Sequence, residues 1–463
     1  MPAPDAVIAA ARARFEDTLG DLETLARIPS VSAAGFDPTE VVRSAEAVAS
    51  LLSGLGLDGV EVLRIANAHP YVVGEFRGAG PDAPTALLYA HHDVQPPGRA
   101  DHWLTPPFEP TRRGDGRIYG RGIVDDKAGI LVFVAALRAW LEVQGGPPIN
   151  LKFIIEGEEE IGSTHLAEFL EAYQERLACD VMVLSDTANL EAGLPSITTS
   201  LRGLVNVDVS VRALDHPLHS GMWGGAVPDA ASALAVVLAR LFDVDGEINI
   251  PGLCDDVSPL SESERAELAR LPFGLAAFRS DAGVVASAHV PADLWERLWR
   301  RPSLAVTALE GRPLAEAANQ LIDVARARVG LRLAPGQDAK RALARLVGVL
   351  ERDPPWGVEV KTDCETAVGG WSTRPEGPAF DAARRALAAG FGRAAVCIGC
   401  GGSIPFVAPF ASVLGGVPAL LLGLEDPLCN AHGENESLYV DDFFKAVTSA
   451  AHLFEELATL GRG

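Results

Sequence analysis

Acidic and histidine side chains follow several apolar segments of this 463-residue chain, at the points where those segments end. The segment 85–89 leads into His91, His92 and Asp93. Because side chains alternate along a strand, His91 and Asp93 point to the same side. A metal-bound histidine needs an acceptor on its second ring nitrogen, which Asp93 would supply. The spacing predicts a metal ligand with its orienting carboxylate, and two turn histidines at a strand end are the alternative.

Two further acidic groups are placed by turns. Residues 119–127, YGRGIVDDK, bring Asp125 and Asp126 to the start of a helix, where aspartate is also a common cap. The apolar segment 149–155 runs into the glutamate cluster EGEEE at 156–160. Carboxylates within a few ångström of one another cannot all ionise without a compensating cation. The cluster indicates a cation site, with a solvated acidic turn as its competitor.

The remaining candidates come from two later segments. Asp186 follows the apolar segment 181–184, and the sequence NAHGENE, residues 430–436, follows the segment 419–422. In open α/β sheets, ligands bind at the carboxyl ends of the strands. All these acidic and histidine groups lie at such an end or in the next loop, which predicts one shared site.

The elements that must position these groups follow an α/β pattern. Short buried strands alternate with helices up to about residue 197, and the alternation resumes near residue 379. We expect strands at 85–89, 149–155, 181–184 and 419–422, and helices at 41–52, 127–144, 380–390 and 442–460. This pattern is typical of a mostly parallel sheet with helices on both faces.

The middle of the chain has a different pattern. Strands that alternate or lie at an edge are expected at 204–211, 329–333 and 358–360, helices at 230–242 and 339–351, and an irregular, partly helical stretch at 255–302. Such a block predicts an α+β domain with an antiparallel sheet, inserted into the first domain. The α/β domain would then comprise residues 1–197 and 372–463, and the inserted domain residues 198–371.

Composition excludes some partners. The chain has 62 acidic and 39 basic residues, a formal net charge of −23. Nucleic-acid binders neutralise phosphates with Lys and Arg, so neither nucleic acid nor an anionic membrane is expected as a partner. The N-terminal segment lacks the layout of a signal peptide, and six scattered cysteines fit a reducing compartment. These features favour a cytoplasmic location.

Several common motifs are absent or misplaced. GLGLDG at 54–59 matches G-x-G-x-x-G, but it follows a helix and precedes a strand, so we expect a helix end and a turn. The sequence contains no Walker A, H-E-x-x-H or G-x-S-x-G motif. The uncharged stretch 394–424 is broken by glycine and proline, and within it Cys397 and Cys400 are expected as buried side chains beside a glycine turn.

Together, seven sequences resemble the motifs of the M20 family of di-zinc metallopeptidases, in one order over nearly the whole chain. They are AHHDVQPPG, YGRGIVDDKAG, IIEGEEEIGS, VLSD, LHSGMWGG, GGSIP and NAHGENE. That family includes aminoacylases, succinyl-diaminopimelate desuccinylase and carnosine-type dipeptidases. The resemblance implies two Zn²⁺ ions per chain, although Mn²⁺ or Co²⁺ could substitute because oxygen ligands predominate.

The resemblance also implies roles for single residues. The expected metal ligands are His91, Asp125, Glu160, Asp186 and His432. Asp125 would bridge both ions, and its bond to Asp126 is expected in cis. Asp93 would stand behind His91, and Glu159 would act as the general base.

The inserted domain also contains sequences that resemble motifs of this family. LHSGMWGG resembles a lid segment whose histidine reaches into an active site, in many relatives that of the other subunit. His219 is therefore the candidate for stabilising the oxyanion, with a histidine packed under Trp223 as the alternative, and a homodimer through the inserted domain is expected. Ser403 and the N–H groups of Gly401 and Gly402 are expected to bind the substrate carboxylate.

Two departures bear on the substrate. Dipeptidase relatives commonly have Arg-Glu where this chain has Gly399-Cys400, and their segment N-x-I-P-x-[RK] becomes NQLIDV from Asn319. A carboxylate-binding cation would therefore be missing. Arg332 is the candidate to replace it, unless it is a surface arginine. The stretch 103–122 and the LHSGMWGG segment still favour the dipeptidase branch.

We therefore expect a metal-dependent hydrolase that cleaves the amide bond of dipeptides or short peptides. The first alternative is a deacylase or desuccinylase acting on an N-acyl amino acid. The second, from another class, is a non-catalytic metal-binding scaffold that dimerises. The presence of Glu159 beside a complete ligand set argues against the non-catalytic scaffold, because a protein that only binds metal does not need a general base there.

Overall fold

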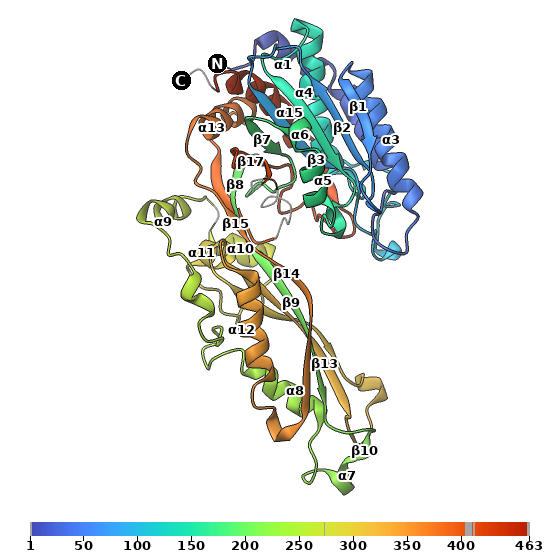
Figure 1. Cartoon of the computed structure of the whole chain (residues 1–463), viewed down its shortest axis with the longest axis vertical. Helices are drawn as coiled ribbons and strands as arrows, with labels where there is room; N and C mark the ends of the chain where they lie inside the picture. The colour runs from blue at the N-terminus through green and yellow to red at the C-terminus, as the bar shows by residue number, and fades with distance from the viewer. Residues whose placement is uncertain (1, 273, 403–409, 411–412, 461–463) are drawn as a thin grey trace.

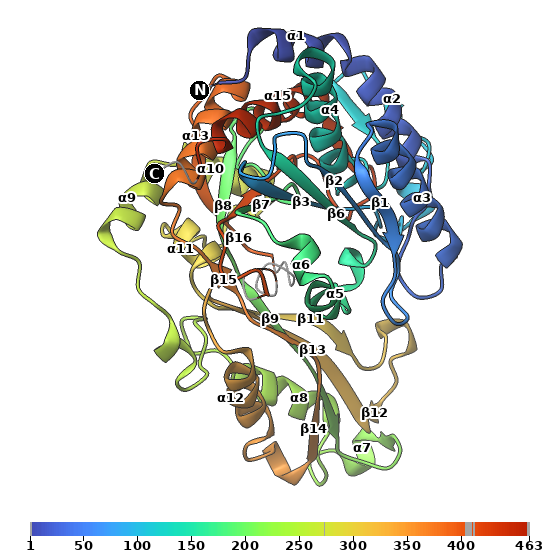
Figure 2. The same ribbon diagram turned by 45° about the horizontal axis from the view of Figure 1, so that its top comes forward.

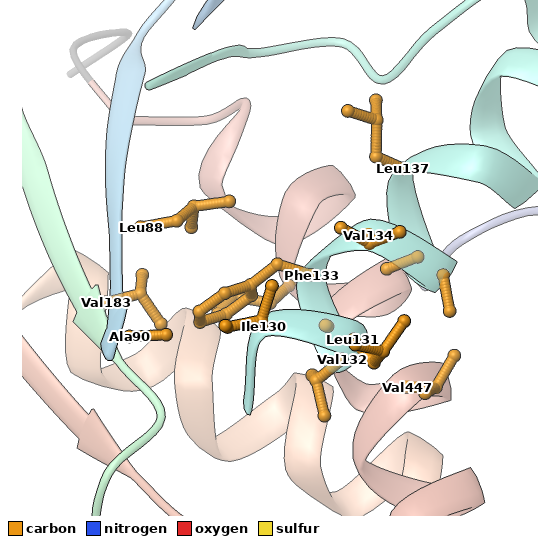
Figure 3. Packing of buried hydrophobic residues seen from close by; sticks show 14 of the residues in the cluster. Leu88, Ala90, Ile130, Leu131, Val132, Phe133, Val134, Leu137, Val183 and Val447 are labelled. Carbon is orange, nitrogen blue, oxygen red and sulfur yellow. The ribbon is translucent and has the colours of Figure 1, made fainter. Parts of the chain in front are cut away.

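Helix α4 (Lys127–Gln144) shows why the first part of the chain folds into layers. It is apolar on nearly every side and almost wholly buried, so it can lie only between other elements. Figure 3 shows Ile130 and Phe133 pointing toward Leu88 and Val183 of two neighbouring strands. The computed structural model describes residues 2–272, 274–402, 410 and 413–460.

A nine-stranded sheet forms the centre of the α/β domain. Its strands are β1 (Asp58–Leu63), β2 (Tyr71–Phe76), β3 (Thr85–His91), β6 (Asn150–Glu156), β7 (Val181–Leu184), β8 (Ser196–Leu201), β15 (Trp371–Ser372), β16 (Val396–Cys400) and β17 (Ala419–Leu422). The order is β1-β2-β6-β3-β7-β17-β8-β15, with β16 paired to β8. The central strands β6, β3, β7 and β17 run parallel, as expected, and antiparallel strands flank them.

Helices cover both faces of this sheet, which also agrees with the expectation (Figures 1 and 2). One face carries α1 (Asp5–Ala13), α2 (Phe15–Ala26), α3 (Pro38–Gly54), α4, α13 (Pro378–Phe391) and α15 (Val440–Leu457). The other face carries α5 (Leu166–Ala172) and α6 (Gln174–Leu177). Each face has its own continuous apolar core.

Some local expectations differ from the structure. The strand expected after the segment 54–59 is β1, which lies at the edge of the sheet and is mostly exposed. Cys397 and Cys400 lie within strand β16 and are only partly buried, and the glycine bend at 401–402 follows Cys400 directly. The segment 54–59 folds as expected, since α3 ends at Gly54 and β1 begins at Asp58.

A second, four-stranded sheet forms the inserted domain. Its strands are β9 (Gly203–Arg212), β11 (Ser303–Glu310), β13 (Val324–Leu333) and β14 (Glu359–Val368), in the order β11-β13-β9-β14, and every pair is antiparallel. Alternate valines of β9 are buried and share a core with α8 (Ala230–Ala239) and α12 (Ala339–Glu351). The irregular stretch contains α9 (Glu262–Ala269), α10 (Leu275–Asp281) and α11 (Leu294–Trp299).

Two short connections join the sheets. Arg202 separates β8 from β9, and residues 369–370 separate β14 from β15. The far end of the inserted domain carries β10 (Leu218–His219), α7 (Ser220–Trp223) and β12 (Gln320–Leu321) (Figures 1 and 2). The domain limits given above stay a prediction. None of the helices in the described part of the chain is long and apolar enough to cross a membrane.

Candidate active site

The five predicted metal ligands lie close together at one edge of the main sheet. They are His91 at the end of β3, Asp125 before α4, Glu160 in the short helix η2 (Glu159–Ile161), Asp186 after β7 and His432 before β18 (Ser437–Tyr439). Parallel strands bring their carboxyl ends to the same edge, which is why segments far apart in the sequence meet here.

Their ligand atoms form two groups that share Asp125. One group is His91, Asp125 and Asp186, the other is Asp125, Glu160 and His432, and within each group the atoms lie within 4.8 Å of one another. The Nε2 atom of His91 lies 2.9 Å from Oδ1 of Asp125, and Nε2 of His432 lies 3.0 Å from Oδ2. The two oxygens of one carboxylate therefore face two different histidines. The peptide bond between Asp125 and Asp126 is cis.

Asp93 holds both His91 and the glutamate turn. The Nδ1 atom of His91 lies 3.1 Å from the Asp93 carbonyl oxygen and 3.4 Å from its Oδ1, which leaves Nε2 facing the other ligands. The Asp93 carboxylate also accepts hydrogen bonds from the backbone N–H groups of Glu159 and Glu160. One buried carboxylate thus orients a histidine and fixes the turn that carries both glutamates.

The carboxylates of the site raise one another's proton affinity. Burial, followed by the charge of Asp186, raises the pKa of Glu159 well above its ordinary value. Burial also raises the pKa of Asp186 to about 6. Asp125 differs, because hydrogen bonds to His432 and His91 outweigh its burial and hold its pKa below the ordinary range.

This donor set fits divalent cations. Carboxylate oxygens and imidazole nitrogens are ligands of zinc and of related ions. The raised pKa values of Asp186 and Glu159 show that the buried carboxylates here have too little positive charge around them. Bound cations would supply that charge.

Gln95 distinguishes the two adjacent glutamates. Its backbone N–H and side-chain amide donate to the two carboxylate oxygens of Glu160 at 3.0 and 2.7 Å. In the described part of the chain, no residue donates a hydrogen bond to the carboxylate of Glu159. Glu160 is therefore held in one orientation, whereas no hydrogen bond from the described residues fixes the carboxylate of Glu159.

A buried ion pair holds the loops that carry Asp125 and His432. Arg121 lies 2.7 Å from Glu436, whose carboxylate accepts from the N–H groups of residues 122, 124 and 125. Arg121 also donates to the carbonyl oxygen of His432 at 3.0 Å. His432 has φ +63°, which is uncommon for a residue other than glycine. The ion pair stabilises the backbone that turns this histidine toward Asp125.

One group of predicted substrate-binding residues lies where the two sheets join. Arg332, near the end of β13, pairs with Ser303 of β11. Arg202 donates to the Ser303 hydroxyl at 2.8 Å and to the Gly401 carbonyl oxygen at 3.2 Å. Burial, and then the charge of Arg332, lowers the pKa of Arg202 to about 10, so the two guanidinium groups are neighbours.

The predicted carboxylate pocket is described only in part. Gly402 accepts a backbone hydrogen bond from Arg202 at 3.2 Å, which places it beside Gly401 and the arginine pair. Ser403, the third predicted member, lies outside the described residues.

His219 and Asn319 form a second group at the far end of the inserted domain. β10 pairs with β12, and the N–H of Ser220 donates to the carbonyl oxygen of Asn319 at 2.8 Å. Both residues are exposed, and Figures 1 and 2 show β10 far from β3 and β7. The part of β13 from Val324 to Arg332 separates this end from Arg332, a length of roughly 27 Å. The structure does not bring His219 or Asn319 to the ligands of their own chain.

Comparison with known proteins decides the family. The sequence pattern of peptidase family M20/M25/M40 matches residues 87–456 of this chain. The chain belongs to this family.

Similar proteins agree with that assignment. A cysteinylglycine-S-conjugate dipeptidase of Corynebacterium striatum is 33% identical over 404 residues, 85% of each chain. The structure of human carnosine dipeptidase 1 has a TM-score of 0.85 and 27% identity, covering 99% of this chain and 100% of the other. The di-peptidase Dug1p of Saccharomyces cerevisiae also has a TM-score of 0.85, at 25% identity and 99% coverage of each chain. The resemblance to M20 metallopeptidases is confirmed, and the protein is an enzyme of that family.

Several residues of this M20 peptidase site were not predicted from the sequence. Gln95, Arg121 and Glu436 lie inside the motifs AHHDVQPPG, YGRGIVDDKAG and NAHGENE, so the motifs themselves were the signal. Arg202 and Glu425 lie in none of the seven motifs. Glu425 is a partly buried carboxylate close to Asp125 and Asp186.

Proposed function

We propose that this M20 peptidase is a dipeptidase that binds two Zn²⁺ ions per chain, with Mn²⁺ or Co²⁺ as substitutes. The observation that supports this best is the pair of ligand groups sharing Asp125. His91 and Asp186 would hold one ion with Asp125, and Glu160 and His432 would hold the other. When bound, the two cations would polarise the scissile carbonyl and lower the pKa of the attacking water.

Glu159 is the proposed general base. Its carboxylate would take the proton of the attacking water and return it to the amine that leaves, so that the amide C–N bond breaks with no net change in protons. A base in this role must hold the proton between the two steps. Glu159 is adjacent to the ligand Glu160 and belongs to neither ligand group, so its carboxylate is left for that role.

The substrate carboxylate would bind where the sheets join. Arg202 and Arg332 provide two neighbouring cations beside Gly401 and Gly402, and a guanidinium group can bind a carboxylate through two N–H groups. Arg332 would thereby replace the cation that is missing after Asn319. The similar proteins are named as dipeptidases, which supports a substrate with a free carboxylate one residue beyond the scissile bond.

We also propose a homodimer formed through the inserted domain. β11 lies at the edge of the four-stranded sheet, with unpaired backbone groups that a second copy could cover. Near His219, Met222 and Trp223 are 77% and 48% exposed. A second copy packed there would bury this apolar surface and present His219 and Asn319 to the site of the partner chain.

A cytoplasmic location completes the proposal. All six cysteines are free, as expected in a reducing compartment.

The experiment that tests the function is a hydrolysis panel with metal-reconstituted protein. Zn²⁺, Mn²⁺ and Co²⁺ forms are assayed against dipeptides, tripeptides and N-acetyl amino acids. We expect the dipeptides to be cleaved fastest. Faster cleavage of N-acyl amino acids would favour a deacylase, and a protein that binds two ions but cleaves no substrate would be the scaffold.

Asp125→Ala should abolish activity, because it removes a ligand from both groups at once. Metal analysis of gently purified wild-type protein should approach two equivalents per chain, and the variant should lose both. Asp208→Ala, which removes a carboxylate from the inserted domain, is the matched control and should keep both. A wild-type stoichiometry that stays near one after saturation would exclude the bridging role.

A further inference from the structure

Glu425 lies beside the metal ligands without being one of them. It is three residues past β17, and its backbone pairs with Ala188, two residues after Asp186. The N–H of Asn189 donates to the Glu425 carbonyl oxygen at 2.7 Å. Neither group of potential ligand atoms in the described part of the chain includes Glu425. Its position is fixed by the backbone, and its carboxylate has another use.

That carboxylate has acidic neighbours and no bound partner. Over the described residues, none donates a hydrogen bond to the Glu425 side chain or forms an ion pair with it. Burial, and then the charges of Asp125, Asp186 and Glu436, raises its pKa well above the ordinary value. Because no described residue donates to it, this carboxylate can accept hydrogen bonds from a charged donor that comes from outside the protein.

An apolar cavity of about 320 Å³ is lined by residues around Glu425, among them Pro427, two residues after it. Ala188, the backbone partner of Glu425, lines it, and so does Cys400, whose pKa is raised first by burial and then by the charges of Glu425 and Asp186. The outer walls include Phe278, Trp295, Trp299, Ile398 and Pro427. Trp295 and Trp299 are stacked, with ring centroids 4.6 Å apart. The cavity is therefore mainly apolar, and Ala188 and Cys400 are the lining residues that connect it to Glu425.

We infer that Glu425 binds the free α-ammonium group of the substrate and that the cavity takes the side chain of its first residue. A peptide whose scissile carbonyl lies at the ligand cluster places its ammonium group one carbon away, near Asp186. The ammonium donates hydrogen bonds to the Glu425 carboxylate, and a bulky apolar side chain fills the cavity that Phe278, Trp295 and Trp299 line. This rests on the proposed function and specifies it: the substrates are dipeptides with a free amine and an apolar or aromatic first residue.

Wild-type protein tests this without any substitution. Phe-Gly, 3-phenylpropanoyl-glycine and Gly-Gly are compared, because the second lacks only the amine and the third only the side chain. A site built around a polar group rejects an analogue that lacks its partner by a large factor, so we expect kcat/KM for Phe-Gly to exceed that for 3-phenylpropanoyl-glycine by about 10²-fold or more. Cleavage of both at similar rates would overturn the inference and leave the peptidase proposal intact. Cleavage of no peptide at all would overturn the proposed function itself.

Glu425→Gln should remove this discrimination. The ratio of kcat/KM for Phe-Gly over 3-phenylpropanoyl-glycine is expected to fall about 10²-fold, with two metal equivalents retained. Glu46→Gln, at an exposed carboxylate on α3, is the matched control and should keep the wild-type ratio. An unchanged ratio in the Glu425 variant would contradict the inference. Loss of a metal equivalent would also contradict it, because Glu425 would then be a metal ligand.

The cavity has its own test. Ala282 lines it beyond the end of α10, and Ala282→Trp would fill it. The ratio of kcat/KM for Phe-Gly over Gly-Gly should fall about 10-fold, since one apolar contact in a pocket changes selectivity by about that factor. If that ratio is unchanged in a folded variant, the side chain binds elsewhere.

Discussion

Charged side chains are arranged differently in the α/β domain and in the inserted domain. In the α/β domain, His91, Asp125 and Asp186 are crowded at the end of a buried sheet, with ligand atoms within 4.8 Å. In the inserted domain, Arg328 pairs with Asp208 at 2.7 Å on the side of the sheet away from the helices, where both side chains are more than a third exposed. The ligand cluster of one domain concentrates carboxylates, whereas this ion pair of the other domain neutralises its charges at the surface.

This difference in the placement of charge indicates which interactions stabilise each domain. The core of the inserted domain is made of valine, leucine and alanine from β9, β13, α8 and α12, and it needs no ligand. The α/β domain has larger apolar cores, which can offset the cost of burying carboxylates at one edge. We therefore expect substitutions in the cluster to affect activity and metal binding most, and those at the far end of the inserted domain to affect activity with the metals retained.

Glu159→Gln is expected to show the largest effect that leaves the metals bound. The amide keeps the shape of the carboxylate and removes its basicity, so kcat should fall by about 10²- to 10⁴-fold. Metal content should stay at the wild-type level, because Glu159 belongs to neither ligand group. Glu160→Gln is the paired variant, and it should lose metal. If Glu159→Gln lost metal and Glu160→Gln kept it, Glu159 would be the metal ligand and Glu160 the general base.

His219→Ala tests whether the inserted domain takes part in the reaction. Loss of one oxyanion donor typically lowers kcat by about 10²- to 10³-fold, and we expect that loss with both metals retained. His216→Ala, an exposed histidine three residues away, is the control and should behave as wild type.

The same variant distinguishes action within one chain from action across a dimer. Because β10, which carries His219, lies far from β3 and β7 of its own chain in Figure 1, mixing His219→Ala with Glu159→Gln subunits should restore activity at one site per heterodimer. Absence of complementation between subunits that are shown to exchange would assign His219 to its own chain. An unchanged kcat in the single variant would leave it no role in the reaction.

The two domains also differed in how far the sequence could predict them. The metal-ligand candidates were predictable because His91, Glu160 and Asp186 each follow an apolar strand, and parallel strands end at one edge. The proximity of Arg202 and Arg332 was not predictable. It depends on how β9, β11 and β13 align, and these strands together span more than a hundred residues of the sequence. Glu425 was missed for a related reason: a lone glutamate in a loop has no local pattern.

Glu156→Gln is the smallest expected effect and concerns stability alone. Glu156 ends β6, is buried, and accepts hydrogen bonds from the hydroxyl groups of Tyr89 at 2.8 Å and Tyr71 at 3.3 Å. Burial raises its pKa to about 8, whereas an unfolded glutamate titrates near roughly 4.3. The folded state therefore holds the proton more tightly. The cost of ionising Glu156 is absent below roughly pH 4 and grows as the pH rises toward about 8.

Glutamine keeps an acceptor for Tyr89 and has no charge to bury, so metal-free Glu156→Gln protein should be more stable than wild type at neutral pH. Each pKa unit corresponds to about 1.4 kcal/mol, and pH 7 lies roughly 2.7 units above the pKa of the unfolded state, so we expect a gain of up to about 4 kcal/mol in the free energy of unfolding by urea near pH 7. Near pH 4 the two proteins should be equally stable, because the wild-type carboxyl group is then neutral in both states. Glu46→Gln, at an exposed site, should change neither value. A variant less stable than wild type at both pH values would mean that Glu156 is held in its charged form, and that the α/β domain tolerates buried charge beyond the metal ligands.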